Sequence, residues 1–239
     1  ELGEIPYYIQ FTLTGYGRDI EPGLPDKHEL IRIFRETAET AGRDRMVWRY
    51  DPVLFNERYP AEYHFRAFEA IAEGICGCTD KVVISFLDCY GKTKRNMRGI
   101  PLELPDEETM KRTGERFVKT AEKYGMTVES CAETVDLSEV GVRHGSCVDP
   151  AMIERILGVP VRMKKDKNQR PECGCVESVE TGAYDTCLCG CKYCYANDSE
   201  GAVMRRREEY DVDSPLLCGR VEEGDRITVR RTSRILTGE

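Results

Sequence analysis

The sequence predicts an α/β fold, arranged as a partial or rearranged TIM-like (β/α) barrel with a cysteine-rich C-terminal segment. Strand-like apolar runs alternate at least four times with amphipathic helical patterns, which is typical of a parallel sheet with crossover helices. The alternation stops near residue 160 of 239, whereas a complete barrel needs ~250 residues. Cysteines then become frequent. We therefore expect residues 1–160 to form a barrel-like domain that lacks its N-terminal strands, and residues 161–239 to form the cysteine-rich segment and tail.

The first half of the pattern contains two strands and two helices. Residues 7–13 are rich in aromatic and β-branched side chains and predict a buried strand. Asp26 followed by Glu29 resembles a capping box, and the helix that it starts should end at Gly42. Residues 46–50 predict a second strand that stops at Pro52, and Pro60 opens a helix that reaches about Gly74.

The second half repeats the alternation. The near-continuous apolar run at 82–87 is typical of a parallel strand that is covered on both faces. A long helix should run from Asp106 to about Gly125, followed by a strand at 126–130. Asp149 and Pro150 predict the cap and first residue of a short helix that closes at Gly158. The charged tail from about residue 197 should contain one strand, at 226–230, and an exposed helix surface at Arg205–Arg207.

The composition points to a reduced, cytoplasmic location. The chain carries 12 cysteines in 239 residues and shows neither a signal peptide nor an apolar run long enough to span a membrane. We expect these cysteines to be metal ligands in the cytoplasm rather than disulfides. The net charge of −8 argues against a protein dominated by nonspecific nucleic-acid affinity. Because a strand pattern starts almost at once and no initiator Met precedes it, we expect that an N-terminal segment is missing.

Three cysteines in one loop carry the strongest functional signal. Cys187, Cys191 and Cys194 have the spacing C-x3-C-x2-C, and Tyr193 precedes the last of them. Three thiolates can hold three irons of a [4Fe–4S] cluster, which leaves the fourth iron without a protein ligand. An open iron can bind the amino and carboxylate groups of S-adenosylmethionine. The alternative is a zinc knuckle, because Cys189 would supply a fourth thiolate for a tetrahedral zinc site.

The spacing with an aromatic residue before its last cysteine resembles the radical S-adenosylmethionine superfamily. The sequence Tyr193-Cys194-Tyr195 is similar to that of spore photoproduct lyase relatives. Four segments also resemble a bacterial family of unknown function with a C-terminal cysteine cluster. These segments are residues 8–19, 48–52, 165–170 and 173–196.

The resemblance implies a reaction. Cys187, Cys191 and Cys194 would ligate the reactive cluster, with Tyr193 near the adenine of S-adenosylmethionine. Reductive cleavage would start radical chemistry on an unknown substrate, with electrons from a donor such as a ferredoxin or flavodoxin. Two features depart from the expected pattern. The cluster loop follows all the barrel strands, whereas most radical S-adenosylmethionine enzymes place it after the first strand. Leu188 and Cys189 stand where members of the bacterial family tend to have a Pro-His pair. We therefore expect a rearranged fold, with Cys189 as a spare thiol.

A second group of cysteines could bind a further metal. Cys173 and Cys175 form a C-x-C pair, Cys131 ends a predicted strand, and Cys147 precedes a predicted helix. Four thiolates would fully ligate an auxiliary [4Fe–4S] cluster. The alternative is buried inert thiols together with a structural zinc. Cys76, Cys78, Cys89 and Cys218 are expected to be ordinary thiols, although Cys89 could face the site.

Polar residues follow the predicted strands, where parallel barrels place their active sites. Arg49 and Asp51 are the candidates for binding S-adenosylmethionine or substrate, and capping or ion pairing on a wet rim is the simpler alternative. Trp48 should be a core residue. The other rim candidates are Thr14, Arg18, Asp88 and Glu133.

The second candidate function is a non-catalytic module. The run Arg162–Arg170 has five positive residues and one negative, and could contact phosphate or nucleic acid. Zinc or an inert iron–sulfur cluster would then hold this segment in shape. A solvated linker face is the simpler interpretation of the same run.

Overall fold

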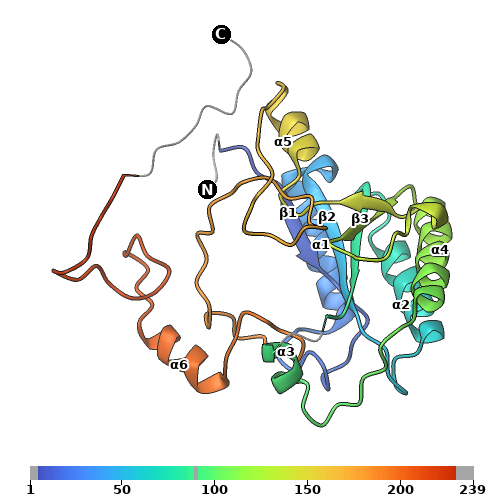
Figure 1. Ribbon diagram of the computed structural model, residues 1–239, viewed down its shortest axis with the longest axis horizontal. Helices are drawn as coiled ribbons and strands as arrows, with labels where there is room; N and C mark the ends of the chain where they lie inside the picture. The colour runs from blue at the N-terminus through green and yellow to red at the C-terminus, as the bar shows by residue number, and fades with distance from the viewer. Residues whose placement is uncertain (1–4, 89–90, 230–239) are drawn as a thin grey trace.

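The protein contains a five-stranded parallel sheet in the order β1-β2-β3-β4-β5, seen in a computed structural model that describes residues 5–88 and 91–229 (Figure 1). All four strand pairs are parallel. The sheet is open, so the expected barrel does not close. The strands are β1 (Ile9–Thr12), β2 (Met46–Val53), β3 (Lys81–Phe86), β4 (Thr127–Cys131) and β5 (Arg143–Gly145).

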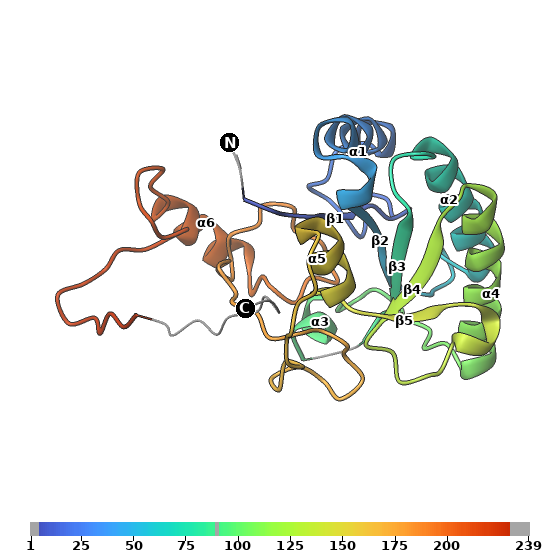
Figure 2. The same ribbon diagram turned by 90° about the horizontal axis from the view of Figure 1, so that it is seen from above.

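Three long helices cover one face of this sheet (Figure 2). They are α1 (Lys27–Ala41), α2 (Ala61–Gly74) and α4 (Glu107–Lys123). One-sided cover follows from the strand order, because right-handed crossovers between successive neighbouring strands all fall on the same face. The main core lies between the sheet and these helices. Trp48 and Tyr50 of β2 pack there with Phe68 and Phe117, and the rings of the two phenylalanines stack with centroids 4.2 Å apart.

The other face of the sheet is mostly polar. Side chains alternate along a strand, so Val82 and Ile84 enter the helix-covered core while Lys81 and Ser85 face the opposite side. Helix α5 (Pro150–Leu157) covers part of this side through Met152, which packs on Val47 and Val83. The polar remainder therefore gathers towards the carboxyl ends of the strands.

The chain beyond α5 crosses this polar side as irregular loops before it forms α6 (Glu200–Glu208) (Figure 1). Short helical pieces complete the fold: α3 (Gly91–Asn96), η1 (Arg43–Arg45) and η2 (Ser138–Val140). The predicted domain boundary near residue 160 stays a prediction. Among the described residues, no helix combines the length and apolarity that crossing a membrane requires.

Most predicted elements are confirmed, with caps where the sequence placed them. Asp26, Asp106 and Asp149 each cap the helix that follows, and the tail arginines lie on α6. Three expectations about strands were wrong or incomplete. Strand β2 continues past Pro52 to Val53. The pairing with β3 shifts register between Tyr50 and Val53, so the strand tolerates a proline, which has no N–H to donate to a neighbouring strand. Residues 226–229 form no strand, and Arg230 lies outside the described residues. Strand β5 was not predicted.

Candidate functional site

Four cysteines from three chain segments converge at the carboxyl edge of the sheet. We call Cys131, Cys147, Cys173 and Cys175 the four-cysteine cluster. Cys131 ends β4, Cys147 follows β5, and the C-x-C pair arrives from the loops beyond α5. The Sγ atoms of Cys131 and Cys147 are 3.1 Å apart, and Cys173 and Cys175 are buried against them. The structure thus brings together the four cysteines that the sequence analysis grouped as candidate ligands of a second metal site.

Backbone N–H groups point at the sulfur atoms of this cluster. The amides of Cys147 and Val148 donate to Sγ of Cys175 at 3.2 and 3.4 Å, and the amide of Cys175 donates to Sγ of Cys173 at 3.5 Å. Sulfur of a neutral thiol is a weak acceptor, whereas a thiolate is a strong one. The amides of Val148 and Cys147 act to lower the pKa of Cys175, but burial outweighs them and raises that pKa to about 11.

Arg49 connects the cluster to the polar face of the sheet. Its Nη1 donates to Sγ of Cys147 at 2.8 Å and to Oε1 of Gln10 at 2.7 Å. Its Nε donates to Asp51 at 3.0 Å, and Asp51 also accepts from Ser85. The predicted pair Arg49 and Asp51 does lie together, but both groups are already engaged by protein partners. Gln10, which supports the guanidinium, was not singled out from the sequence.

The two neighbouring thiols, Cys147 and Cys131, have pKa values shifted in opposite directions. A hydrogen bond from Cys131 lowers the pKa of Cys147 to about 6, assisted by the Arg49 guanidinium and opposed by burial. The same hydrogen bond, together with burial, raises the pKa of Cys131. The carbonyl of Cys147 is fixed by the hydroxyl of Tyr8 at 2.5 Å and the amide of Gln10 at 2.8 Å. The cluster is thus a thiol–thiolate arrangement held by a guanidinium.

The second group of cysteines is the loop from Cys187 to Cys194, which we call the C-terminal cysteine loop. It packs on the turn that follows β1. The amide of Lys192 donates to the carbonyl of Ile20 at 2.8 Å, and the amide of Gly23 donates to the carbonyl of Cys189 at 3.0 Å. A Cβ at Gly23 would meet the Cys189 carbonyl oxygen at 2.7 Å, so glycine is required for this close approach.

A buried carboxylate, Glu21, holds the loop in place. Oε1 of Glu21 accepts from the hydroxyl of Tyr193 at 2.5 Å and from Thr14 at 2.6 Å, and Oε2 pairs with Lys27. Glu21 is 2% exposed. Burial raises the pKa of Tyr193, and the Glu21 charge adds to the effect. Tyr193 is thus a protonated hydrogen-bond donor that anchors the loop.

Asparagines from outside the loop bind its backbone. Nδ2 of Asn96, at the end of α3, donates to the carbonyl of Cys194 at 3.1 Å. Nδ2 of Asn197 donates to the carbonyl of Cys187 at 2.7 Å. The other side-chain atom of Asn197, Oδ1, is buried without a hydrogen-bond partner. An orphaned acceptor beside a cysteine loop is unusual, because buried polar atoms are normally paired.

Two thiols of this loop, those of Cys191 and Cys189, have raised pKa values. Burial raises the pKa of Cys191 to about 12, and the charge of Glu21 adds to this. Burial and a hydrogen bond with Cys187 raise the pKa of Cys189 to about 11. Within residues 5–88 and 91–229, no group of three or more Cys, His, Asp or Glu side chains stands in a geometry that could hold a metal ion.

The remaining rim candidates lie apart from each other. Thr14 supports Glu21, whereas Arg18 is exposed. Asp88 pairs with Arg170 at 2.6 Å. Burial, with Asp88 adding to it, raises the pKa of Glu133 to about 7, although this carboxylate accepts from the amide of Phe86. Trp48 is a fully buried core residue, as expected.

Sequence reasoning missed Glu21 and Asn96, and could not place Cys89, which lies outside the described residues. A signal for Glu21 was present in the sequence. Glu21 is followed by Pro22 and Gly23, which are typical of a turn, and a turn after the first strand can lie at the carboxyl edge of the sheet. Nothing in the sequence linked Asn96 to the cysteine loop.

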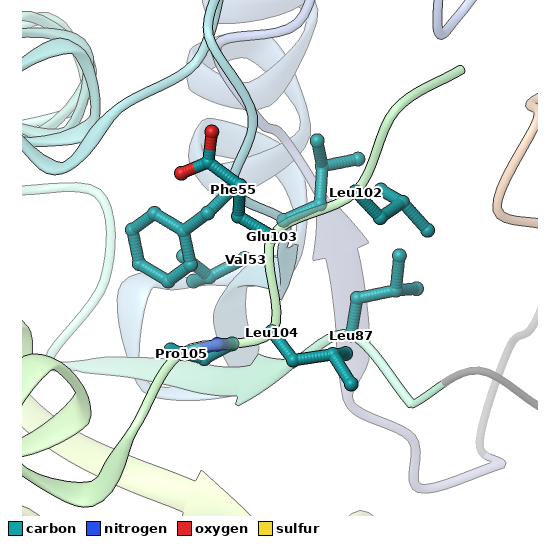
Figure 3. Close-up of a pocket in the computed structure, with 8 residues that line it drawn as sticks. Val53, Phe55, Leu87, Leu102, Glu103, Leu104 and Pro105 are labelled. Atoms are coloured by element: carbon teal, nitrogen blue, oxygen red, sulfur yellow. The ribbon is translucent and has the colours of Figure 1, made fainter.

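A small pocket on the helix-covered side is a different feature (Figure 3). Val53, Phe55, Leu87 and Leu102 are among its lining residues, and Glu103 contributes its single titratable side chain. The amide of Glu103 is bonded to the carbonyl of Phe55 at 2.9 Å. An apolar hollow of this kind brings no convergent catalytic groups together.

Comparison with known proteins gives a family but no function. The comparison with curated proteins and the comparison with solved structures each gave no match. A family model described as "Domain of unknown function (DUF1848)" matches residues 1–196, which include both cysteine groups. The chain belongs to this family of unknown function.

Proposed function

We propose that this protein is a radical-S-adenosylmethionine-type enzyme, with Cys187, Cys191 and Cys194 as the cluster ligands. The observation that carries the proposal is the docking of the C-terminal cysteine loop on the turn after β1, through Lys192, Gly23 and Glu21. Enzymes of the superfamily carry their cluster loop directly after the first strand. Here the cysteine loop comes late in the chain, but it contacts the turn after β1. It therefore lies near the end of the first strand even though it does not follow that strand in the sequence.

The donor set supports the proposal chemically. Thiolates are the usual ligands of iron–sulfur clusters, and three of them leave one iron open. When bound, a reduced cluster would supply one electron for the reductive cleavage of S-adenosylmethionine to methionine and, with a hydrogen atom taken from substrate, 5′-deoxyadenosine. That electron comes from a ferredoxin- or flavodoxin-type donor. The chain itself would supply position, polarity and exclusion of water.

Particular residues fit these tasks. The hydroxyl of Tyr193 donates a hydrogen bond to Glu21, and the centroid of its ring lies 6.1 Å from that of Tyr16. Both contacts hold the loop in place. Arg49 and Asp51 present a charged pair at the same edge of the sheet. In this proposal they orient the amino and carboxylate groups of S-adenosylmethionine or a polar substrate.

The competing candidate is a non-catalytic zinc- or iron–sulfur-binding module associated with nucleic acid. One observation favours it: the thiol of Cys189 is hydrogen-bonded to that of Cys187, so a fourth sulfur is at hand to close a zinc site. The charge of the chain opposes nucleic-acid binding, since the net value is −8.

Anaerobic reconstitution with iron and sulfide tests the two candidates. The radical-enzyme proposal expects a brown protein that forms 5′-deoxyadenosine from S-adenosylmethionine once it is reduced. A triple Cys187→Ala, Cys191→Ala, Cys194→Ala variant should lose both properties. The control, Cys76→Ala with Cys78→Ala, should keep both. A colourless protein with zinc at the loop and salt-sensitive binding to DNA or RNA would replace the proposal with the binding module.

A further inference from the structure

We propose that the four-cysteine cluster is a structural zinc site, in which Cys131, Cys147, Cys173 and Cys175 bind one Zn²⁺ ion as four thiolates. This site is separate from the C-terminal cysteine loop and does not depend on the radical chemistry proposed for that loop.

The first argument is the convergence of four sulfurs. A redox-active pair would require only two neighbouring thiols, and inert buried thiols would not have to lie near one another at all. Neither alternative explains why four cysteines come together. Here Cys131 and Cys147 are in sulfur–sulfur contact, and Cys173 and Cys175 are both 5% exposed and pack in the same buried cluster. Four cysteines are the most common ligand set of closed, structural zinc sites.

The second argument is spacing. With Zn–S bonds of about 2.3 Å and tetrahedral angles, ligand sulfurs lie about 3.8 Å apart. The sulfurs of Cys131 and Cys147 are 3.1 Å apart, so this pair would separate by about 0.7 Å to receive the ion. The four side chains do not stand in metal-binding geometry without the ion, so they would also have to turn towards it. A [4Fe–4S] cluster bonds each sulfur to a different iron and requires a wider arrangement. The compactness therefore favours a single ion over the auxiliary cluster expected from the sequence.

The third argument is the arrangement of donors around the sulfurs. Four thiolates and Zn²⁺ carry a net charge of −2, which needs partners outside the metal's own ligands. Arg49 supplies a guanidinium to Sγ of Cys147, and the amides of Cys147 and Val148 supply two N–H bonds to Sγ of Cys175. These groups would then be hydrogen-bond partners of the metal-bound sulfurs.

The site would attach the C-terminal loops to the sheet. The amide of Val176 donates to the carbonyl of Val148 at 3.1 Å, and the amide of Asp166 donates to the carbonyl of Cys175 at 3.0 Å. The ion would join these loops to the ends of β4 and β5. The C-terminal cysteine loop follows in the chain, so its position would depend on this clamp.

The chain contains a matched control for the experiment. Cys76-Gly77-Cys78 repeats the Cys-Gly-Cys order of residues 173–175, but Cys76 is exposed and Cys78 packs against the main core instead of the four-cysteine cluster. We would purify the full chain and three double or triple variants, and measure zinc, iron and sulfide per chain. The variants are Cys173→Ser with Cys175→Ser, Cys76→Ser with Cys78→Ser, and Cys187→Ala with Cys191→Ala and Cys194→Ala.

The expected result is one zinc per chain in the wild type, in the Cys76/Cys78 variant and in the Cys187/Cys191/Cys194 variant, and none in the Cys173/Cys175 variant. Loss of iron with the Cys187 group alone would leave this proposal intact, and failure of radical chemistry would not affect it. Loss of iron and sulfide from the Cys173/Cys175 variant would overturn it in favour of a second cluster. A Cys131–Cys147 disulfide, seen in the wild type by peptide mass, would overturn it in favour of a redox pair.

A measurement on the wild type alone covers the case in which the Cys173/Cys175 variant fails to fold. Replacement of zinc by Co²⁺ should give the visible spectrum of a tetrahedral site with four sulfur ligands, and X-ray absorption at the zinc edge should show four sulfurs at ~2.3 Å. Nitrogen or oxygen ligands in that shell, or absence of bound zinc, would contradict the proposal.

Discussion

The hydroxyl of Tyr193 lies 2.5 Å from Oε1 of Glu21, although the two residues are 172 positions apart in the chain. Glu21 follows the first strand of the sheet, and Tyr193 lies between two cysteines of the C-terminal loop. One buried carboxylate thus joins the start of the fold to the C-terminal cysteine loop. Removal of this carboxylate should release the loop while every cysteine stays in place.

We expect Glu21→Ala to lower the free energy of unfolding by about 2–4 kcal/mol, because Thr14, Tyr193 and Lys27 lose their common acceptor. Hydrogen exchange of residues 186–196 should become faster. The exposed Glu29→Ala is the control, since it loses only a surface pair with Arg32. Equal protection of the loop in wild type and Glu21→Ala would show that the carboxylate does not anchor it.

Gly23 offers an independent way to displace the same loop. A Cβ at this position would come within 2.7 Å of the Cys189 carbonyl oxygen, which is a backbone atom that cannot rotate away. We expect Gly23→Ala to expose the C-terminal cysteine loop to limited proteolysis. Gly224→Ala meets no atom within 4 Å and should cleave like the wild type. Unchanged proteolysis of Gly23→Ala would mean that the loop is not docked there in solution.

The sequence predicted the helices of the fold well, because their signals are local. Helix α4 combines a capping Asp106 with apolar residues at helical spacing, and the structure begins and ends it within two residues of the expected positions. Strand β5 has three residues, two of them exposed, and carries no such signal. The strand order and the open sheet depend on pairing between distant segments, which the alternation of elements alone could not determine.

The cysteine groups show the same division between local and distant information. The sequence placed Cys131 at the end of a strand and Cys147 before a helix, but strand β5, which brings Cys147 to the same edge as Cys131, was not predicted. The docking of Cys189 against Gly23 and the support from Asn96 arise from contacts between segments far apart in the chain. No spacing rule connects these residues, so the anchors of the loop required a structure.

Arg49 should be important for stability as well as for the site. Arg49→Met leaves Asp51 and the Cys147 sulfur without their cation in a partly buried location, and we expect a loss of about 2–3 kcal/mol in unfolding free energy. Arg49→Lys keeps the charge but not the planar fork, and should lose less. Urea denaturation of both variants, beside the exposed Arg112→Met, would measure this. A loss in Arg49→Met no larger than that in Arg112→Met would refute the expectation.

His64 should make stability depend on acid pH. It is fully buried, its Nδ1 lies 2.8 Å from the Tyr50 hydroxyl and its Nε2 lies 2.8 Å from the Leu54 carbonyl. Burial lowers its pKa from 6.5 to about 4. The neutral ring is therefore favoured in the folded state, and its contribution is present above pH ~6.5 and is lost as the pH falls towards ~4.

The difference between wild type and His64→Gln isolates this effect from the carboxylates, which titrate in both proteins. The stability advantage of the wild type should shrink by about 2–3 kcal/mol between pH 7.5 and 4.5, because the unfolded wild-type chain takes up a proton that the folded one refuses. Urea unfolding at the two pH values measures it. A difference that stays constant with pH would mean that the ring is already protonated, or accessible to solvent, in the folded protein.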